Sequence, residues 1–229
     1  MAGIYIRIDV DKPFGKKNII NRGLSKIREN YYFPIIDNIY LKGLEDLINL
    51  LNKNKIISHI YFRNCTYPKL NHLQLLTEGK HIIGFHAENT KNFETFKYEF
   101  NQFSKKMKTK ITTFTKHGSG IYKLGKHHYP KYEPEKYKLW AKKLNIDFSF
   151  GNKIITASDI NNFEVAFWIE HGYRHPSFNT INQLIEHAKN HDVVVLIHPS
   201  NYEKDKKVKK DFKKLIKLIL KNNINIKTI

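Results

Sequence analysis

Acidic and histidine side chains recur where short apolar segments of this sequence end. The first segment, GIYIRID, closes on Asp9, and Asp11 follows two residues later. Later segments are followed by His86, His117 and His198. Carboxylate oxygen and imidazole nitrogen bind zinc and similar divalent ions, and a further carboxylate or imidazole beside such an ion can act as base or acid. The pattern predicts a metal-dependent site.

Four further polar positions are candidates for the same site. Glu88 lies two residues after His86 and is either another metal ligand or a solvated loop acid. Ser119 could offer its backbone N–H to an oxyanion. In HGYRHP, Arg174 could bind an anionic group or orient a carboxylate, and His175 could bind substrate or be structural.

Apolar periodicity indicates the elements that would position these residues. Strands are expected over 3–9, 55–63, 80–85, 111–115, 146–150, 165–169, 193–197 and 224–229, and helices over 41–54, 70–77, 92–107, 134–144, 178–190 and 203–222. Strands separated by helices predict a parallel α/β architecture. We expect one irregular (β/α)7–8 barrel domain over 1–229, with an open doubly wound sheet as the alternative. Functional residues of parallel barrels gather where strands end, so the predicted ligands should converge.

The composition limits the class of protein. A chain of 229 residues with 41% hydrophobic content can bury one sizeable core. The single cysteine, Cys65, excludes an intramolecular disulfide and a cysteine-based zinc cage. No apolar run approaches the ~20 residues of a membrane helix, and residues 1–11 lack a signal-peptide pattern, so a cytoplasmic protein is expected.

The formal net charge of +19 raises nucleic acid as a partner. Almost all of the basic residues are lysine, however, and the scarcity of arginine, which makes bidentate contacts to phosphate and guanine, weakens that interpretation. Lys, Asn and Ile are abundant together, as an A- and T-rich genome would produce. The lysine excess would also suit a phosphate-bearing substrate.

Taken in order, these segments resemble the motifs of the polysaccharide deacetylases of the NodB-homology type, which are carbohydrate esterase family 4-like members of the glycoside hydrolase/deacetylase superfamily. IRIDVD is similar to the first motif, which implies Asp9 as catalytic base and Asp11 as metal ligand. IIGFHAENT is similar to the second motif and implies that His86 binds the metal. VLIHP resembles the last motif and implies that His198 is the general acid. The resemblance spans nearly the whole chain and implies an irregular barrel.

Two departures from the family pattern stand out. The second motif normally has another histidine four residues after the first, where this chain has Thr90. The third motif normally carries an arginine and a proline, where this chain reads TKHGSG. If a metal is bound, Glu88 and His117 are the candidates for the missing ligand.

The resemblance implies a hydrolase that removes an acetyl group from an N-acetylated sugar or glycoconjugate precursor. It would use a divalent metal ion, and Zn²⁺ is the ion we expect. Thr90 motivates an alternative, a non-catalytic carbohydrate-binding or scaffold protein on the same fold. A third possibility is a nucleic-acid-binding protein that uses its lysine-rich surface.

Overall fold

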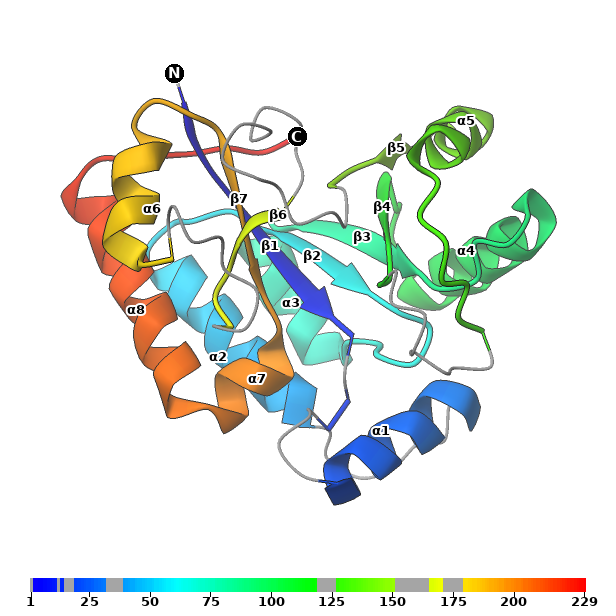
Figure 1. The fold of residues 1–229 in the computed structure, drawn as a ribbon. Helices are drawn as coiled ribbons and strands as arrows, with labels where there is room; N and C mark the ends of the chain where they lie inside the picture. Colours follow the sequence, from blue (N-terminus) through cyan, green and yellow to red (C-terminus); the bar gives the residue numbers. More distant parts are fainter. Residues whose placement is uncertain are drawn as a thin grey trace.

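A parallel sheet of eight strands lies at the centre of the computed structural model (Figure 1), which describes residues 2–11, 13–14, 19–31, 39–118, 127–150, 165–170 and 179–229. The strands are β1 (Gly3–Val10), β2 (His59–Phe62), β3 (Ile82–Ala87), β4 (Thr113–Lys116), β5 (Asp147–Phe148), β6 (Val165–Trp168), β7 (Val193–Ile197) and β8 (Asn225–Ile226). Their order is β5-β4-β3-β2-β1-β7-β6, with β8 paired to the start of β1. The predicted parallel α/β fold is confirmed, and within the described residues the sheet is open between β5 and β6, as in an irregular barrel.

Eight helices of the described residues flank the sheet. They are α1 (Ile19–Tyr31), α2 (Ile39–Lys53), α3 (Leu70–Glu78), α4 (Phe93–Met107), α5 (Pro134–Leu144), α6 (Ile181–Ala188), α7 (Pro199–Lys204) and α8 (Lys206–Lys221). Figure 1 shows α2, α7 and α8 side by side on one flank and α4 and α5 at the far end of the sheet. Within the described residues, no helix combines the length and apolar character needed to cross a bilayer.

Strand β1 is central and has two chemically different faces. Every residue of the strand is buried. Because side chains alternate along a strand, Ile4, Ile6 and Ile8 join the main apolar core, whereas Arg7 and Asp9 point to the opposite face. The strand therefore contributes to the core on one side and delivers charged groups to the interior on the other.

Parallel register brings several strand ends to one edge of the sheet. Asp9 pairs with Tyr61 of β2, and His86 of β3 pairs with Thr115 of β4. His117 directly follows β4, and His198 directly follows β7, the neighbour of β1 on its other side. The topology thus carries the sequence-predicted ligands to the carboxyl-terminal edge of the sheet.

Packing of the helices fixes these strand ends. The aromatic face of α4 covers β3, with the Phe103 and Phe85 rings 4.9 Å apart. Helix α7 begins immediately after His198 and packs closely on α2, where a Cβ added at Gly43 would lie 2.0 Å from the Pro199 carbonyl oxygen. Gly43 therefore lets the segment after His198 sit against the core.

The observed helices differ from the predicted ones in three places: one helix was not predicted, and two predicted helices have other bounds. Helix α1 was not expected, because its apolar residues Ile19 and Ile20 face solvent, with 84% and 67% of their surface exposed. The helix predicted over 203–222 is interrupted at Asp205, whose carboxylate accepts the Lys207 N–H at 2.8 Å and caps α8. The helix predicted from residue 178 has its cap at Thr180, which forms a capping box with Gln183.

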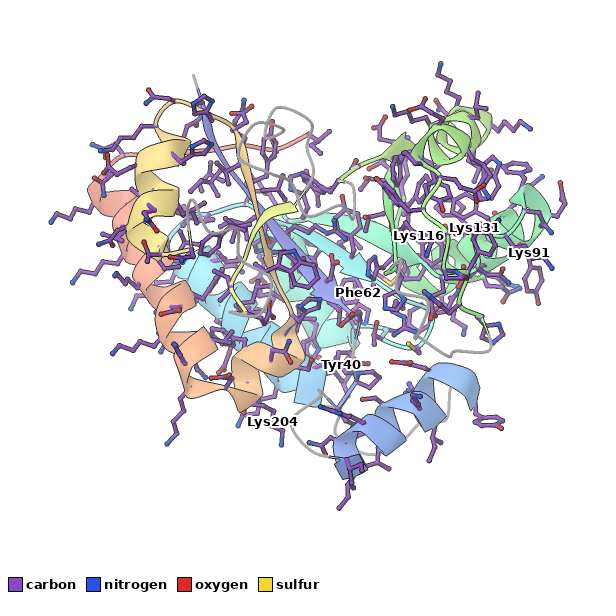
Figure 2. All side chains as sticks on the ribbon, viewed as in Figure 1. Tyr40, Phe62, Lys91, Lys116, Lys131 and Lys204 are labelled. Carbon is purple, nitrogen blue, oxygen red and sulfur yellow. The ribbon has the colours of Figure 1, made fainter. Side chains whose placement is uncertain are left out.

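Surface lysines lie on different sides of the molecule. Figure 2 shows Phe62 at the centre of the sheet, Lys91 shortly before the start of α4, and Lys204 at the end of α7. Lys116 is different, because it is fully buried, and its Nζ donates to the carbonyls of His117 at 2.7 Å and Gly118 at 2.6 Å. One buried cation therefore shapes the turn that follows β4.

Candidate metal centre

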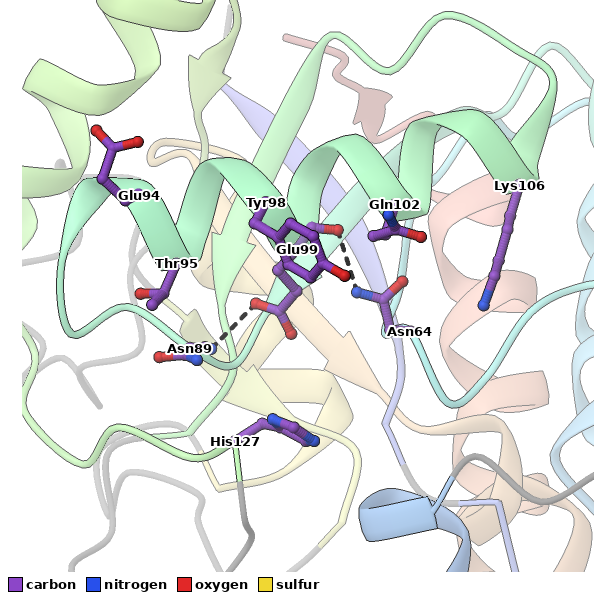
Figure 3. Close-up of a pocket in the computed structure, with 9 residues that line it drawn as sticks. All are labelled: Asn64, Asn89, Glu94, Thr95, Tyr98, Glu99, Gln102, Lys106 and His127. Atoms are coloured by element: carbon purple, nitrogen blue, oxygen red, sulfur yellow. Dashed lines mark hydrogen bonds between the residues drawn. The ribbon is translucent and has the colours of Figure 1, made fainter.

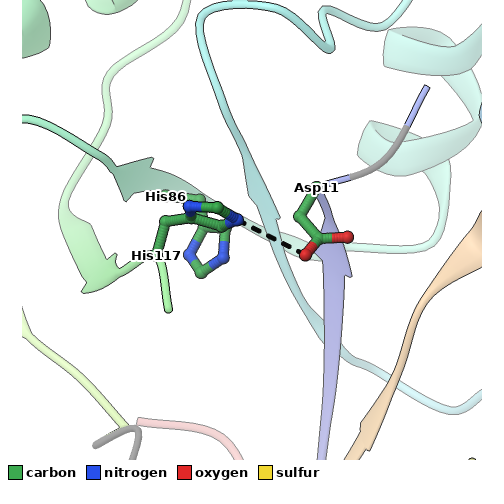
Figure 4. A group of neighbouring side chains, drawn as sticks. All are labelled: Asp11, His86 and His117. Atoms are coloured by element: carbon green, nitrogen blue, oxygen red, sulfur yellow. Dashed lines mark ion pairs between the residues drawn. The ribbon is translucent and has the colours of Figure 1, made fainter. Parts of the chain in front are cut away.

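Three buried side chains converge at the carboxyl-terminal edge of the sheet (Figure 4). Asp11, His86 and His117 each offer a ligand atom within 4.8 Å of the others. Nε2 of His117 lies 3.5 Å from Oδ2 of Asp11, and the two imidazole rings meet edge-on with centroids 5.0 Å apart. One carboxylate and two imidazoles form a donor set of the kind that binds Zn²⁺.

His86 shows why these residues fit a metal ion. Its ring is buried, and Nδ1 has no hydrogen-bond partner among the described residues. Burial, more than its neighbours, lowers the pKa of His86 to about 3. The ring is therefore neutral near pH 7, and neutral imidazole is the form that coordinates a cation.

The two candidates for the missing ligand have different surroundings. His117 belongs to the convergent group. Glu88 instead pairs with the buried Arg63 guanidinium, and its Oε1 lies 4.0 Å from Nδ1 of His117. Thr90, where the family pattern has histidine, is fully buried, with its hydroxyl 3.3 Å from the Tyr137 hydroxyl. The geometry favours His117 over Glu88, and ligation itself stays a prediction.

Asp9 is held by a bidentate ion pair that the sequence analysis missed. Nε and Nη2 of Arg7 donate to its two carboxylate oxygens at 2.7 and 2.6 Å, and both residues are buried. Burial raises the pKa of Asp9, but Arg7 together with His86 and His198 outweighs this, and the pKa lies below its ordinary value. Asp9 is therefore ionised, with Oδ2 3.5 Å from Nε2 of His86. The signal was available, because residues two apart on a strand share a face.

His198 is oriented by Glu170, a second residue that sequence reasoning missed. Oε1 of Glu170 lies 3.0 Å from Nδ1 of His198 and accepts its backbone N–H at 3.1 Å. Burial raises the pKa of Glu170, yet His198 and Asn201 bring it below the ordinary value, so an ionised acceptor holds the proton on Nδ1. Nε2 is then directed to the centre, 3.7 Å from Oδ2 of Asp11. Glu170 follows β6, and the rule that identified the other strand ends would have found it.

Arg63 links the carboxylates around the site. Its guanidinium, almost fully buried, pairs with Glu88, lies 3.2 Å from Oε1 of Glu29, and donates to the backbone carbonyl of Asp11. Glu29 comes from α1, so the unexpected helix contributes to the shell of the site. Three other predicted site residues, Ser119, Arg174 and His175, lie outside the described residues, and their roles stay predictions.

Comparisons with known proteins place the fold. No family model and no curated protein matches the sequence. Among solved structures, a CE4 esterase of Streptococcus mutans aligns with a TM-score of 0.58 at 9% identity, over 98% of this chain and 84% of that one. A peptidoglycan N-acetylglucosamine deacetylase aligns with a TM-score of 0.54 at 10% identity, over 99% and 86%. The chain has the CE4 polysaccharide deacetylase fold. The resemblance deduced from the motifs is confirmed at the level of the fold.

A further CE4 neighbour bears on activity. A CE4 family pseudoenzyme from Bacillus anthracis aligns with a TM-score of 0.55 at 9% identity, over 98% of this chain and 63% of that one. A mutant of it with restored enzymatic activity gives the same TM-score and identity, and this chain covers 65% of its length. The chain thus spans just under two thirds of these two structures. The CE4 fold therefore occurs both with and without enzymatic activity, and the fold alone does not show whether this chain is catalytic.

Proposed function

We propose that the protein is a divalent-metal-dependent hydrolase that removes the acetyl group from an N-acetylated sugar. The observation that carries the proposal is the convergence of Asp11, His86 and His117. Two further side chains lie next to this group: Asp9, which is ionised, and His198, whose ring is oriented by Glu170. A general base and a general acid on either side of a cation are what amide hydrolysis requires.

Each residue has a role in this proposal. Asp11, His86 and His117 would hold the ion, which supplies Lewis acidity by polarising a carbonyl and making water more acidic. Asp9 accepts the proton of the attacking water, and the bidentate contact from Arg7 fixes the direction of its carboxylate.

The leaving group needs a proton as the carbon–nitrogen bond breaks. His198 donates it from Nε2 to the amine nitrogen, and Glu170 holds the ring through Nδ1. The water oxygen joins the acetyl carbon, the electron pair of the broken bond goes to nitrogen, and the products are acetate and the free amino sugar. Zn²⁺ is the metal we propose, because it favours mixed carboxylate and imidazole sites.

Substitutions of Asp11 and Asp9 test whether the first is a metal ligand and the second a general base. Asp11→Ala should abolish stoichiometric zinc binding and acetate release. Asp9→Asn should retain zinc and reduce acetate release by about 10²–10⁴, the range for a positioned acid or base. Zinc content by plasma mass spectrometry and acetate release from N-acetylglucosamine oligomers give both readouts. Equal zinc loss in the two variants would contradict the assignment.

A non-catalytic sugar-binding protein is the second candidate. Thr90 at the position of a family ligand favours it, as does the tight pairing of Asp9 with Arg7, which weakens a base. If the zinc-loaded protein binds N-acetylated sugars but releases no acetate, and His198→Ala changes neither result, this candidate replaces the hydrolase.

A further inference from the structure

Helix α1 presents apolar side chains to solvent, and the proposed hydrolase has no use for them. Ile20, Ile27 and Tyr31 have 67%, 48% and 72% of their surface exposed. Spacings of seven and four residues place the three on one side of an α-helix. Gly23 shares this side, and a Cβ added there would point into open space. We call the side formed by these four residues the outer face of α1.

The opposite side of α1 is anchored to the rest of the protein. Ser25 is buried, and its Oγ accepts the Phe14 N–H at 3.1 Å. Nε of Arg28 donates to the Cys65 carbonyl at 3.3 Å, and Oε1 of Glu29 lies 3.2 Å from Nη1 of Arg63. Because the helix is already formed and held, its outer face can bind a partner with little further loss of conformational entropy.

The charges of α1 are distributed unevenly around the helix. Arg22 and Lys26 are exposed and lie one turn apart, along one edge of the outer face. The single acid of the helix, Glu29, is directed inward to the buried Arg63. The solvent-exposed part of α1 is therefore apolar and cationic.

This combination favours a lipid surface over a protein partner. Lysine is depleted from protein–protein interfaces, whereas helices that lie on anionic bilayers combine an apolar face with Lys and Arg. Tyr31 has an apolar ring with a polar end, which suits the boundary between lipid and water. The formal net charge of +19 adds a long-range attraction to anionic lipid.

An exposed aromatic residue elsewhere shows what sets α1 apart. Tyr98 on α4 has 68% of its surface exposed, but it lines a cavity of about 560 Å³ together with the carboxyl groups of Glu94 and Glu99 (Figure 3). Glu94 is itself exposed, and an anionic surface would repel its carboxylate. Exposure of an aromatic ring alone therefore does not indicate a lipid contact, and the accompanying charges decide.

We propose that the outer face of α1 binds the surface of an anionic lipid bilayer, with its apolar side chains inserted among the headgroups and Arg22 and Lys26 near the lipid phosphates. Figure 1 shows α1 beyond the arrowhead of β1, and Glu29 connects the helix to Arg63 beside the candidate metal centre. The bilayer would therefore lie on the side of the molecule where the strands end. The inference does not depend on the proposed deacetylase activity.

The experiment measures binding of the whole protein to lipid vesicles by co-sedimentation. Vesicles of phosphatidylcholine with about 30% phosphatidylglycerol are compared with vesicles of phosphatidylcholine alone. The test variants are Ile20→Asn, Ile27→Asn, Lys26→Gln and Gly23→Leu. The matched control is Leu220→Asn on the lysine-rich α8, because Leu220 is 47% exposed and Ile27 48%.

We expect the protein to bind the anionic vesicles at least about tenfold more tightly than the neutral ones. Ile20→Asn and Ile27→Asn should each weaken this binding about five- to tenfold, because apolar side chains are lost from the lipid. Lys26→Gln should weaken it about fivefold. Gly23→Leu should strengthen it about fivefold, an effect that a loss of folding cannot produce. Leu220→Asn should bind like the wild type.

Three results would overturn the inference. The first is no binding to anionic vesicles. The second is binding that the isoleucine variants leave unchanged and salt abolishes, which would assign it to the surface lysines in general. The third is a dimer in sedimentation velocity that Ile27→Asn converts to a monomer, which would assign the outer face to a second copy of this chain.

Discussion

Strand β3 has a buried histidine at each end, and the two are held in opposite ways. His81 directly precedes the strand. Its Nδ1 accepts the Ser58 N–H at 3.1 Å, and its Nε2 donates to Oδ1 of Asn52 at 2.7 Å. His86, near the other end, has no hydrogen-bond partner for Nδ1 among the described residues, and Nε2 lies 3.5 Å from the Asp9 carboxylate.

The difference separates a structural histidine from a candidate ligand. Burial lowers the pKa of both rings, to about 4 for His81 and about 3 for His86, so neither exposure nor protonation distinguishes them. What distinguishes them is hydrogen bonding. Both nitrogens of His81 form hydrogen bonds within the fold, whereas Nδ1 of His86 has no partner among the described residues, as expected of a ring that binds a ligand.

The largest expected effect on zinc affinity comes from replacing each of these two histidines with alanine in turn. His86→Ala should weaken zinc binding by at least about 100-fold, because a ligand contributes more than the outer-shell groups whose loss costs 10–100-fold. His81→Ala should leave the zinc affinity unchanged and lower the free energy of unfolding by about 2–4 kcal/mol through lost packing and hydrogen bonds. Competition titration with a zinc chelator and urea denaturation measure the two quantities. Comparable zinc loss in both variants would remove the distinction.

The second comparison concerns the two candidates for the missing ligand. His117→Ala should weaken zinc binding by about 100-fold, like His86→Ala, and should abolish acetate release with it. Glu88→Gln should have a smaller effect on zinc affinity, on the order of tenfold or less, because Glu88 acts through Arg63 and the Asp11 backbone. The same chelator titration measures both. A larger loss for Glu88→Gln would assign the ligand to the acid.

The smallest expected effect is a pH dependence carried by His81. Its pKa in the folded state is about 4, below the value of about 6.5 for an exposed histidine, so the unfolded chain binds the extra proton. His81 therefore lowers stability as pH falls from about 6.5 towards 4, by about 2 kcal/mol at pH 5. His81→Gln should flatten this part of the curve relative to wild type in urea denaturation of zinc-free protein. An unchanged curve would show that His81 is not buried as a neutral ring.

Much of the fold could be predicted because the spacing of apolar residues and the polar residues that follow strands are both local features of the sequence. The runs around Val193–Ile197 and Phe93–Met107 are buried where the pattern indicated. Helix α1 was missed because the apolar residues Ile19 and Ile20 face solvent, contrary to the rule that identifies helices.

The site was only partly predictable, because some of its contacts depend on tertiary structure. Asp11, His86 and His117 could be proposed from their positions after strands, and the structure brings them together. The choice between Glu88 and His117 could not be made, since it depends on Arg63, whose side chain reaches the site from the position just after β2. Arg63 is the last residue of the strand predicted over 55–63, but it is an arginine, and a search for metal ligands does not select it.

The most direct test of the metal centre is anomalous diffraction at the zinc edge from crystals grown with Zn²⁺. We predict one strong peak coordinated by the carboxylate of Asp11 and the imidazoles of His86 and His117, at about 2.0–2.2 Å. Glu88 should remain with Arg63, outside the coordination sphere. A peak elsewhere, no peak at saturating zinc, or coordination through Glu88 in place of His117 would contradict the account.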